Sequence, residues 1–167
     1  VNNGTIINSS AGGGGILNAP FTNNGTVNIQ SGELSSSGGI TGSGSFVIAE
    51  GRKFKITSGT STIGGNSISG SGTFEIQSAT LNITGNAVTI SSGTTFLQTS
   101  GTIEGDGSLI INGTINWVSG TQGGTGTTTI SSTGTGIFTT QNGKALSRTL
   151  ANDGLLEVQS SGAVIFS

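Results

Sequence analysis

The chain has 167 residues and a net charge of −2, and only 7% of its residues are charged, against about 25% in ordinary globular domains. The absence of His, Cys and Tyr excludes disulfides, thiolate metal sites, Ser–His–acid triads and Cys–His pairs. With five Lys and Arg residues the chain has no basic field for nucleic acid, and no apolar run approaches the ~20 residues of a membrane span.

Residues 1–34 contain two similar units, each opened by Asn-Asn-Gly, at 2–4 and 23–25. Gly25 is followed by Val27 and Ile29, which is the alternation of a strand with one buried face. Asn and Gly both tolerate positive φ, so we expect them to form the corner before a strand. A tight hairpin is the competing interpretation of Asn-Gly. It is disfavoured because similar strands follow similar turns, and parallel strands cannot be joined by a tight turn.

The same pattern, a glycine followed by apolar residues two and four positions later, recurs along the chain at intervals of 18 to 35 residues. This glycine, which we call the anchor, recurs at variable distances along the chain, and such a pattern predicts a coil whose loops differ in length. We expect Phe46 to stack on Phe74 and Ile48 on Ile76 in adjacent turns. The expected inward ladder is Val27, Phe46, Phe74, Leu109, Phe138 and Leu156, then Ile29, Ile48, Ile76, Ile111 and Val158, after the turn glycines Gly25, Gly44, Gly72, Gly107 and Gly154.

A second strand is expected six to eight residues after each first inward residue, as at Phe54 or Ile115. The rest of each turn is less regular, and we expect loops to leave the coil there. Residues 119–140 are rich in Thr and Gly, and residues 141–154 are expected to be a longer loop before the last turn. Glycine and serine richness alone would suggest a flexible linker, but the alternating apolar residues predict ordered strands.

These features predict an all-β fold, a parallel β-helix (β-solenoid) of about seven turns. The right-handed form is expected, because crossovers between parallel strands are right-handed. The prediction is a single β-solenoid domain over 1–167 with open, uncapped ends, because a capping unit is not visible at either end. Open ends expose strand edges and core, so we expect them to meet further coils.

Few residues suggest chemistry. Glu104 and Asp106 would suit a carboxylate pair of the kind that glycosidases use, but a solvated strand face or loop is the favoured interpretation. Only Gly105-Asp106-Gly107 approaches a calcium-binding repeat, which needs tandem copies. We therefore expect no catalytic residue, no cofactor and no metal, and predict that the chain is not an enzyme.

Three features suggest binding. The basic cluster at residues 52–55 would suit an anionic glycan, although a polar loop and the outer face of a strand are favoured. Trp117 would suit sugar stacking, but its spacing from Ile115 favours an inward position. A flat, regular array of threonines would suit ice. That function needs Thr at equivalent positions in successive turns. The candidates all lie within one interval, namely Thr127, Thr129, Thr133 and Thr135.

The units ISGSGTFEIQSATLNI (68–83) and IEGDGSLIINGTINW (103–117) resemble the β-helix repeats of bacterial extracellular surface proteins, the autotransporter passengers and filamentous adhesins. The resemblance covers nearly the whole chain as a pattern of Gly and apolar residues. It implies a right-handed parallel β-helix located outside the cell or on the cell surface. Such proteins are mostly adhesive or structural, and no catalytic residue carries over.

The sequence thus predicts a non-enzymatic extracellular structural module, either an adhesin shaft or a filament subunit that stacks end to end. Its expected partners are copies of itself or the flanking solenoid repeats of a longer chain, with surface glycans as a possible addition. Nucleic acid and a membrane span are not expected. The alternative function is a carbohydrate- or ice-binding β-solenoid.

Overall fold

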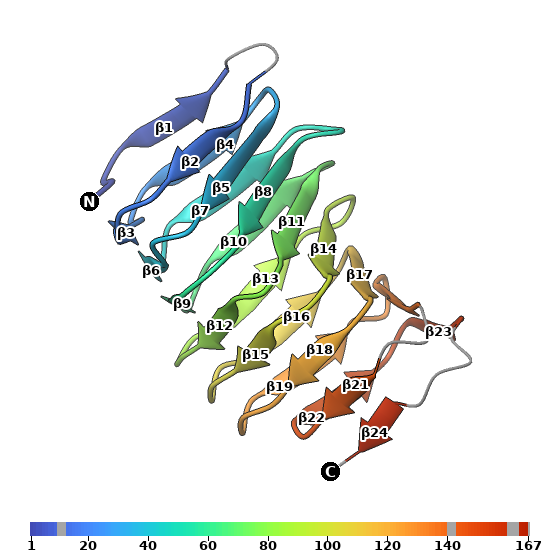
Figure 1. The fold of residues 1–167 in the computed structure, drawn as a ribbon. Coiled ribbons are helices and arrows are strands. Elements are labelled where there is room, and N and C mark those ends of the chain that lie inside the picture. The colour runs from blue at the N-terminus through green and yellow to red at the C-terminus, as the bar shows by residue number, and fades with distance from the viewer. Residues whose placement is uncertain (10–12, 140–142, 160–163, 167) are drawn as a thin grey trace.

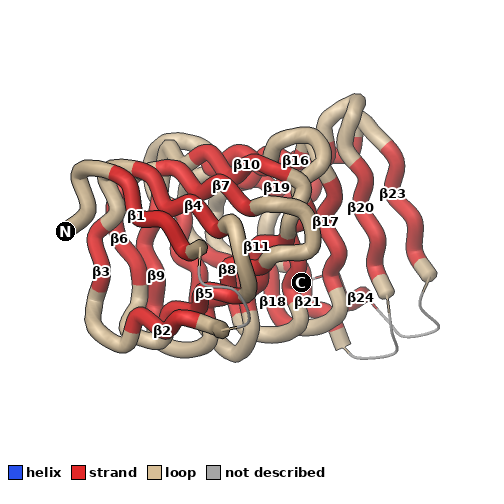
Figure 2. The backbone as a smooth tube through the Cα atoms, turned by 90° about the horizontal axis from the view of Figure 1, so that it is seen from above, coloured by secondary structure: helices blue, strands red, loops and turns tan. Residues whose placement is uncertain are grey.

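The computed structural model describes residues 1–9, 13–139, 143–159 and the backbone of 164–166. It is a β-solenoid whose coils are stacked along one axis (Figure 1). The strands of successive coils form three parallel sheets of eight strands each. About seven turns therefore separate the first strand of each sheet from the last. The described residues contain no helix, and tan corners join the strands throughout (Figure 2). The predicted fold class is confirmed.

Each coil contributes one strand to each sheet, and we name the sheets by their first strands. The β1 sheet contains β1 (Thr5–Asn8), β4 (Thr26–Ile29), β7 (Ser45–Ile48), β10 (Ser67–Gly70), β13 (Val88–Ile90), β16 (Leu109–Ile111), β19 (Thr127–Ile130) and β22 (Thr149–Asn152). The β2 sheet contains β2 (Gly15–Leu17), β5 (Glu33–Ser36), β8 (Lys53–Ile56), β11 (Thr73–Ile76), β14 (Thr95–Gln98), β17 (Thr114–Trp117), β20 (Thr135–Phe138) and β23 (Leu155–Val158). The β3 sheet contains β3 (Phe21–Thr22), β6 (Ile40–Gly42), β9 (Thr60–Ile63), β12 (Thr80–Ile83), β15 (Thr102–Glu104), β18 (Gly120–Gln122), β21 (Lys144–Leu146) and β24 (Val164–Phe166).

The coils are more regular than the sequence suggested. Val27 is in register with Phe46, and Phe46 with Ile68, so one coil takes 19 or 22 residues. The intervals of 28 and 35 residues between the expected anchors contain ordinary strands, such as β12 to β15, and the expectation of loops leaving the coil there was wrong. Within 141–154, residues 144–146 and 149–152 form β21 and β22, while 141 and 142 lie outside the described residues.

The alternation of apolar residues builds the core, because successive side chains of a strand point to opposite faces. In β8, for example, Phe54 and Ile56 are fully buried and the two lysines lie on the outer face. Of the expected inward residues, those from Val27 to Phe138 are at most 3% exposed. Leu156 is half-buried, and Val158 is 55% exposed in the last strand of its sheet.

The register of the expected ladder is correct in part. Val27 lies on Phe46, and Ile29 on Ile48, as predicted. Phe74, however, belongs to the β2 sheet and lies in register with Phe54 and Phe96. The rings of Phe46 and Phe74 do touch, with centroids 5.4 Å apart at 76°, but they meet across the core from different sheets.

The other expected ladder residues are redistributed in the same way. Ile76 lies on Ile56 and Gln98 rather than on Ile48. The pairings of the remaining residues are Leu109 with Val88 and Thr128, Ile111 with Ile90 and Ile130, Phe138 with Trp117 and Val158, and Leu156 with Gly136. The physical reason is that the same glycine pattern precedes strands of two sheets: Gly44 precedes β7, whereas Gly72 precedes β11.

The turn glycines are required for a different reason from the one expected. Gly25, Gly44, Gly72, Gly107 and Gly154 are not among the residues with positive φ. They are positions where the preceding coil leaves no room for a side chain. A Cβ at Gly25 would lie 2.0 Å from the carbonyl oxygen of Gly4, and one at Gly44 would lie 2.4 Å from that of Gly25. Positive φ occurs at other corner glycines, such as Gly42 and Gly70.

A buried polar network interrupts the apolar core in the fifth to seventh coils. Gln122 Nε2 donates to Gln98 Oε1 at 3.1 Å, and Thr128 Oγ1 donates to Gln122 Oε1 at 2.9 Å. Gln98 Nε2 in turn donates to the carbonyl oxygen of Thr121 at 3.1 Å. The amide groups are thereby satisfied, as buried polar groups must be. Trp117, Phe138 and Leu146 form a second, smaller apolar cluster beyond this network.

Candidate functional sites

The basic cluster is largely neutralised by neighbouring carboxylates. Lys53 Nζ lies 2.6 Å from Glu75 Oε2, and Lys55 Nζ lies 3.1 Å from Glu33 Oε1. Glu75 is only 4% exposed, so its pair links two coils across the outer face of the β2 sheet. Arg52 is exposed in the preceding corner. This arrangement supports the interpretation of the cluster as a strand face rather than an anion-binding site.

The two neighbouring acids do not face one another across a shared cavity. Glu104 is on the outer face of β15, in register with Asn82 of the previous coil. Asp106 is exposed in the following corner, where its Oδ1 accepts a hydrogen bond from the backbone N–H of Gly85 at 3.1 Å. The carboxylate of Asp106 therefore links the corners of two neighbouring coils.

Trp117 is a core residue, as its spacing predicted. Its side chain is fully buried, its ring packs edge-to-face on Phe138 at 5.1 Å, and Nε1 donates to the carbonyl oxygen of Ser119 at 3.1 Å. A ring buried in this way has no face for a sugar. The alternative interpretation of Trp117 as a stacking platform was therefore wrong.

Two buried cations were not anticipated from the sequence. Lys144 is 1% exposed and donates from Nζ to the carbonyl oxygen of Thr139 at 2.6 Å. Arg148 is 5% exposed, and its Nη2 donates to the carbonyl oxygen of Gly107, two coils away, at 2.7 Å. Burial lowers the pKa of both side chains. Space for Arg148 exists because residue 126 is glycine, where a Cβ would lie 2.5 Å from Nη2.

Threonines align across coils in positions that the sequence did not reveal. The expectation that they do not align compared residues 127–135, which belong to two strands of one coil. In the β3 sheet one outward column consists of Thr60, Thr80, Thr102 and Thr121. In the β2 sheet another consists of Thr73, Thr95, Thr114 and Thr135. The second outward column of the β3 sheet starts with Thr22, Thr41 and Thr62 and continues with Asn82 and Glu104.

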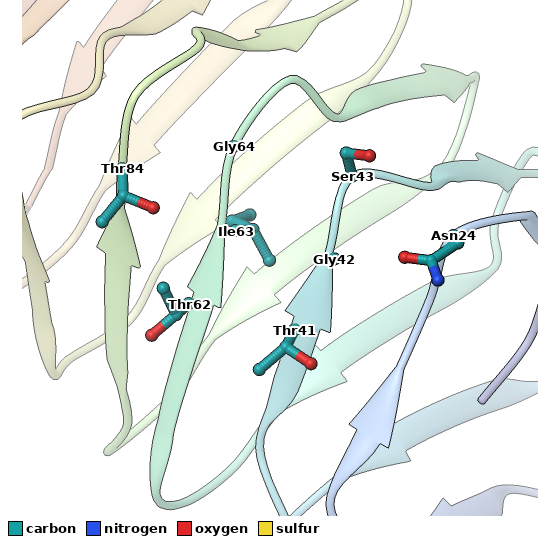
Figure 3. Close-up of a pocket in the computed structure, with 8 residues that line it drawn as sticks. All are labelled: Asn24, Thr41, Gly42, Ser43, Thr62, Ile63, Gly64 and Thr84. Carbon is teal, nitrogen blue, oxygen red and sulfur yellow. The ribbon is translucent and has the colours of Figure 1, made fainter.

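A hollow of about 390 Å³ lies where this second column meets the corner that leads to the β1 sheet. Its lining comes from four successive coils (Figure 3) and consists of Asn24, Thr41, Gly42, Ser43, Thr62, Ile63, Gly64 and Thr84. The lining contains hydroxyl and amide groups and no charged residue. This hollow, which we call the corner hollow, was not identified from the sequence, because its residues belong to corners whose alignment depends on the correct register.

The described residues contain no group of three or more His, Cys, Asp or Glu side chains that could hold a metal ion. They also contain no helix that is long and apolar enough to cross a membrane. Comparison of the chain with protein families, with curated proteins and with solved structures found no match.

Proposed function

We propose that this chain is a non-enzymatic structural module located outside the cell, an adhesin shaft or filament subunit whose coils add end to end. The observation that carries the proposal is the match between the strands at the two ends of the stack. Each sheet ends in one strand of the first coil and one strand of the last. One edge of each of these strands has no neighbour within its sheet, and such edges are templates for further pairing.

The edges of the β1 sheet match residue by residue. Continuing the register of the sheet, β22 would meet β1 of a second copy with Thr149 beside Thr5 and Leu150 beside Ile6. Ala151 would then lie beside Ile7, and Asn152 beside Asn8. The outward threonines would meet, and so would the inward Leu150 and Ile6. The second inward pair would be two asparagines, whose amides can both donate and accept hydrogen bonds. Like residues in like positions are what a continuous parallel ladder requires.

The β2 sheet supports the same alignment. Val158 occupies an inward position, since it is in register with the buried Phe138, yet it is 55% exposed. In the second copy it would lie on Leu17, which is inward and half-buried. Leu156 would lie over Gly15, which leaves space for it as Gly136 does within the chain. Apolar area buried in this contact would stabilise it by about 25 cal/mol per Å².

A head-to-tail contact of this kind is heterologous, and without closure it produces open filaments. In a longer chain, flanking repeats would occupy the same two edges. The location outside the cell rests on the resemblance to β-helix repeats of bacterial surface proteins. Antibody labelling of intact cells of the source organism tests the location: labelling is expected, and labelling only after lysis would contradict it.

The assembly is tested with the purified chain. Sedimentation velocity is expected to show oligomers that grow with concentration. Negative-stain images are expected to show rods whose lengths are multiples of the length of one chain. Val158→Asp places a charge at the inward contact and should abolish the lengthening, whereas Glu157→Gln, on the outward side of the same strand, should not. Monomers at every concentration, or association unaffected by Val158→Asp, would contradict the proposal.

A further inference from the structure

The corner hollow is built into the backbone of four coils. Its lining includes Gly42 and Gly64, where side chains have no room. A Cβ at Gly42 would lie 2.8 Å from Asn24 Oδ1 and 2.3 Å from a backbone oxygen, and one at Gly64 would lie 2.0 Å from the carbonyl oxygen of Thr84. Gly42 also has a φ of 98°, which other residues rarely adopt. The concavity is therefore a fixed feature of the corner.

The walls carry hydroxyl groups that the rest of the chain does not use. The side chains of Ser43, Thr62 and Thr84 line the hollow without a hydrogen bond to another described residue. Thr41 Oγ1 pairs with the hydroxyl of Thr22 at 3.0 Å, and the Asn24 amide nitrogen donates to Asn3 Oδ1 at 3.2 Å. A hydroxyl both donates and accepts hydrogen bonds. The hollow thus offers several donors and acceptors at the spacing of the coils, about 4.8 Å.

This chemistry selects a class of ligand. No charged residue lines the hollow, so it lacks the Arg or Lys that recognises phosphate, sulfate or carboxylate groups. Its lining contains no aromatic side chain and one large aliphatic side chain, Ile63, whereas sites for apolar small molecules are lined mainly by hydrophobic and aromatic side chains. A neutral ligand that carries many hydroxyl groups matches both the donors and the acceptors, and the threonine methyl groups provide contacts for its C–H surfaces.

We propose that the corner hollow binds a neutral oligosaccharide, with its chain lying across successive coils. The central residues of the site, Thr41, Thr62 and Thr84, belong to the second, third and fourth coils, so the core of the site takes no part in end-to-end stacking. An extended ice surface would instead use a flat face, and the flat candidate is the outward column formed by Thr60, Thr80, Thr102 and Thr121. The hollow is open to solvent but confined to four coils, and this limited extent favours a discrete ligand over an extended ice surface.

The test uses the whole chain and three neutral probes, namely cello-, malto- and chito-oligosaccharides, with oligogalacturonate as the charged probe. Binding is measured by titration calorimetry. Thr62→Val removes one hydroxyl at nearly constant volume, and loss of one neutral hydrogen bond is expected to weaken binding by about threefold to tenfold. Thr62→Arg fills the hollow and should abolish binding. The control is Thr102→Val, an outward threonine outside the hollow, which should bind as the unmodified chain does. Thermal melts establish that each variant is folded.

Binding of at least one neutral probe that is weakened by Thr62→Val, lost in Thr62→Arg and retained in Thr102→Val supports the proposal. It is overturned by failure of all three neutral probes to bind, by a preference for oligogalacturonate, or by binding that Thr62→Arg leaves intact. A thermal hysteresis that disappears in Thr102→Val, without any oligosaccharide binding, would also overturn it and would assign the threonine column to ice.

Discussion

Gly4 and Gly25 stand in the same sequence, Asn-Asn-Gly-Thr, in successive coils, and the structure predicts that they respond oppositely to alanine. A Cβ at Gly25 would lie 2.0 Å from the carbonyl oxygen of Gly4 and 2.9 Å from the carbonyl carbon of Asn3, which is backbone and cannot rotate away. A Cβ at Gly4 meets nothing within 4 Å. Neither glycine has a positive φ, so the two substitutions differ only in the contact between coils.

The expected difference in stability between the two alanine variants can be estimated from measured effects of similar substitutions. Inserting an extra methyl group into a closely packed site costs about 1–3 kcal/mol, so Gly25→Ala should destabilise the fold by that amount. Gly→Ala at a permissive position stabilises by about 0.4–1 kcal/mol, because it restricts the unfolded chain. In the unassembled chain, Gly4→Ala should therefore be neutral or slightly stabilising. For a chain of this length, 1 kcal/mol corresponds to roughly 2–4 °C in Tm.

The assay is urea unfolding followed by far-UV circular dichroism, with thermal melts in parallel. The variants should separate, with Gly25→Ala below the unmodified chain and Gly4→Ala at or above it. Gly72→Ala extends the test to an interior coil, since a Cβ there would lie 2.4 Å from both the carbonyl oxygen of Ala49 and Ile48 Cγ2. Equal effects of Gly4→Ala and Gly25→Ala would refute the reasoning, because the two sites would then not differ in contact with a neighbouring coil.

Further predictions concern the core, the ion pairs and pH. Phe74→Ala should lower the free energy of unfolding by about 3–5 kcal/mol, because the ring is fully buried between two in-register phenylalanines. The control is Leu97→Ala, on the outward face, which should lower it by less than about 1 kcal/mol in the same urea assay. Lys53→Met removes the cation beside the Glu75 carboxylate, whose side chain is 5% exposed, and should lower the free energy of unfolding by about 1–3 kcal/mol after allowance for screening. Lys55→Met, whose partner Glu33 is 39% exposed, should lower it by less than about 1 kcal/mol. Equal losses would contradict the argument that burial of the carboxylate makes the first ion pair stronger. The lowered pKa of Lys144 means that the unfolded chain binds more protons between that pKa and 10.5, so stability should rise with pH through this window. Lys144→Met should flatten the rise, and an unchanged slope would contradict the assignment.

The sequence was sufficient for the fold class because its alternation is strong. Strands such as Ser45–Ile48 and Lys53–Ile56 alternate inward and outward residues at a period of two, which only a strand with one buried face explains. The absence of long apolar stretches and the repeated units then predicted stacked coils. Each of these inferences used information that is local in the chain.

The register could not be predicted because the local pattern does not identify the sheet. Gly44 and Gly72 precede similar strands in different sheets, and β10 and β13 of the β1 sheet follow Asn66 and Ala87 rather than a glycine. Anchoring on glycine therefore missed β10 and β13, and with β13 it skipped one whole coil. The threonine columns and the corner hollow depend on which residues of successive coils are neighbours. Because that register was predicted wrongly, neither feature could be identified from the sequence.

The register between coils is tested most directly by engineered disulfides in this cysteine-free chain. The structure places Thr73 beside Lys53 in neighbouring coils, and in-register strands about 4.8 Å apart fall within the Cα separation of about 4.4–6.8 Å that a disulfide needs. In the register expected from the sequence, with Phe46 on Phe74, Thr73 would instead lie beside Ser45. Oxidation of Lys53→Cys/Thr73→Cys should give an intramolecular disulfide by mass spectrometry, and Ser45→Cys/Thr73→Cys should not. The reverse result would contradict the three-sheet solenoid described above.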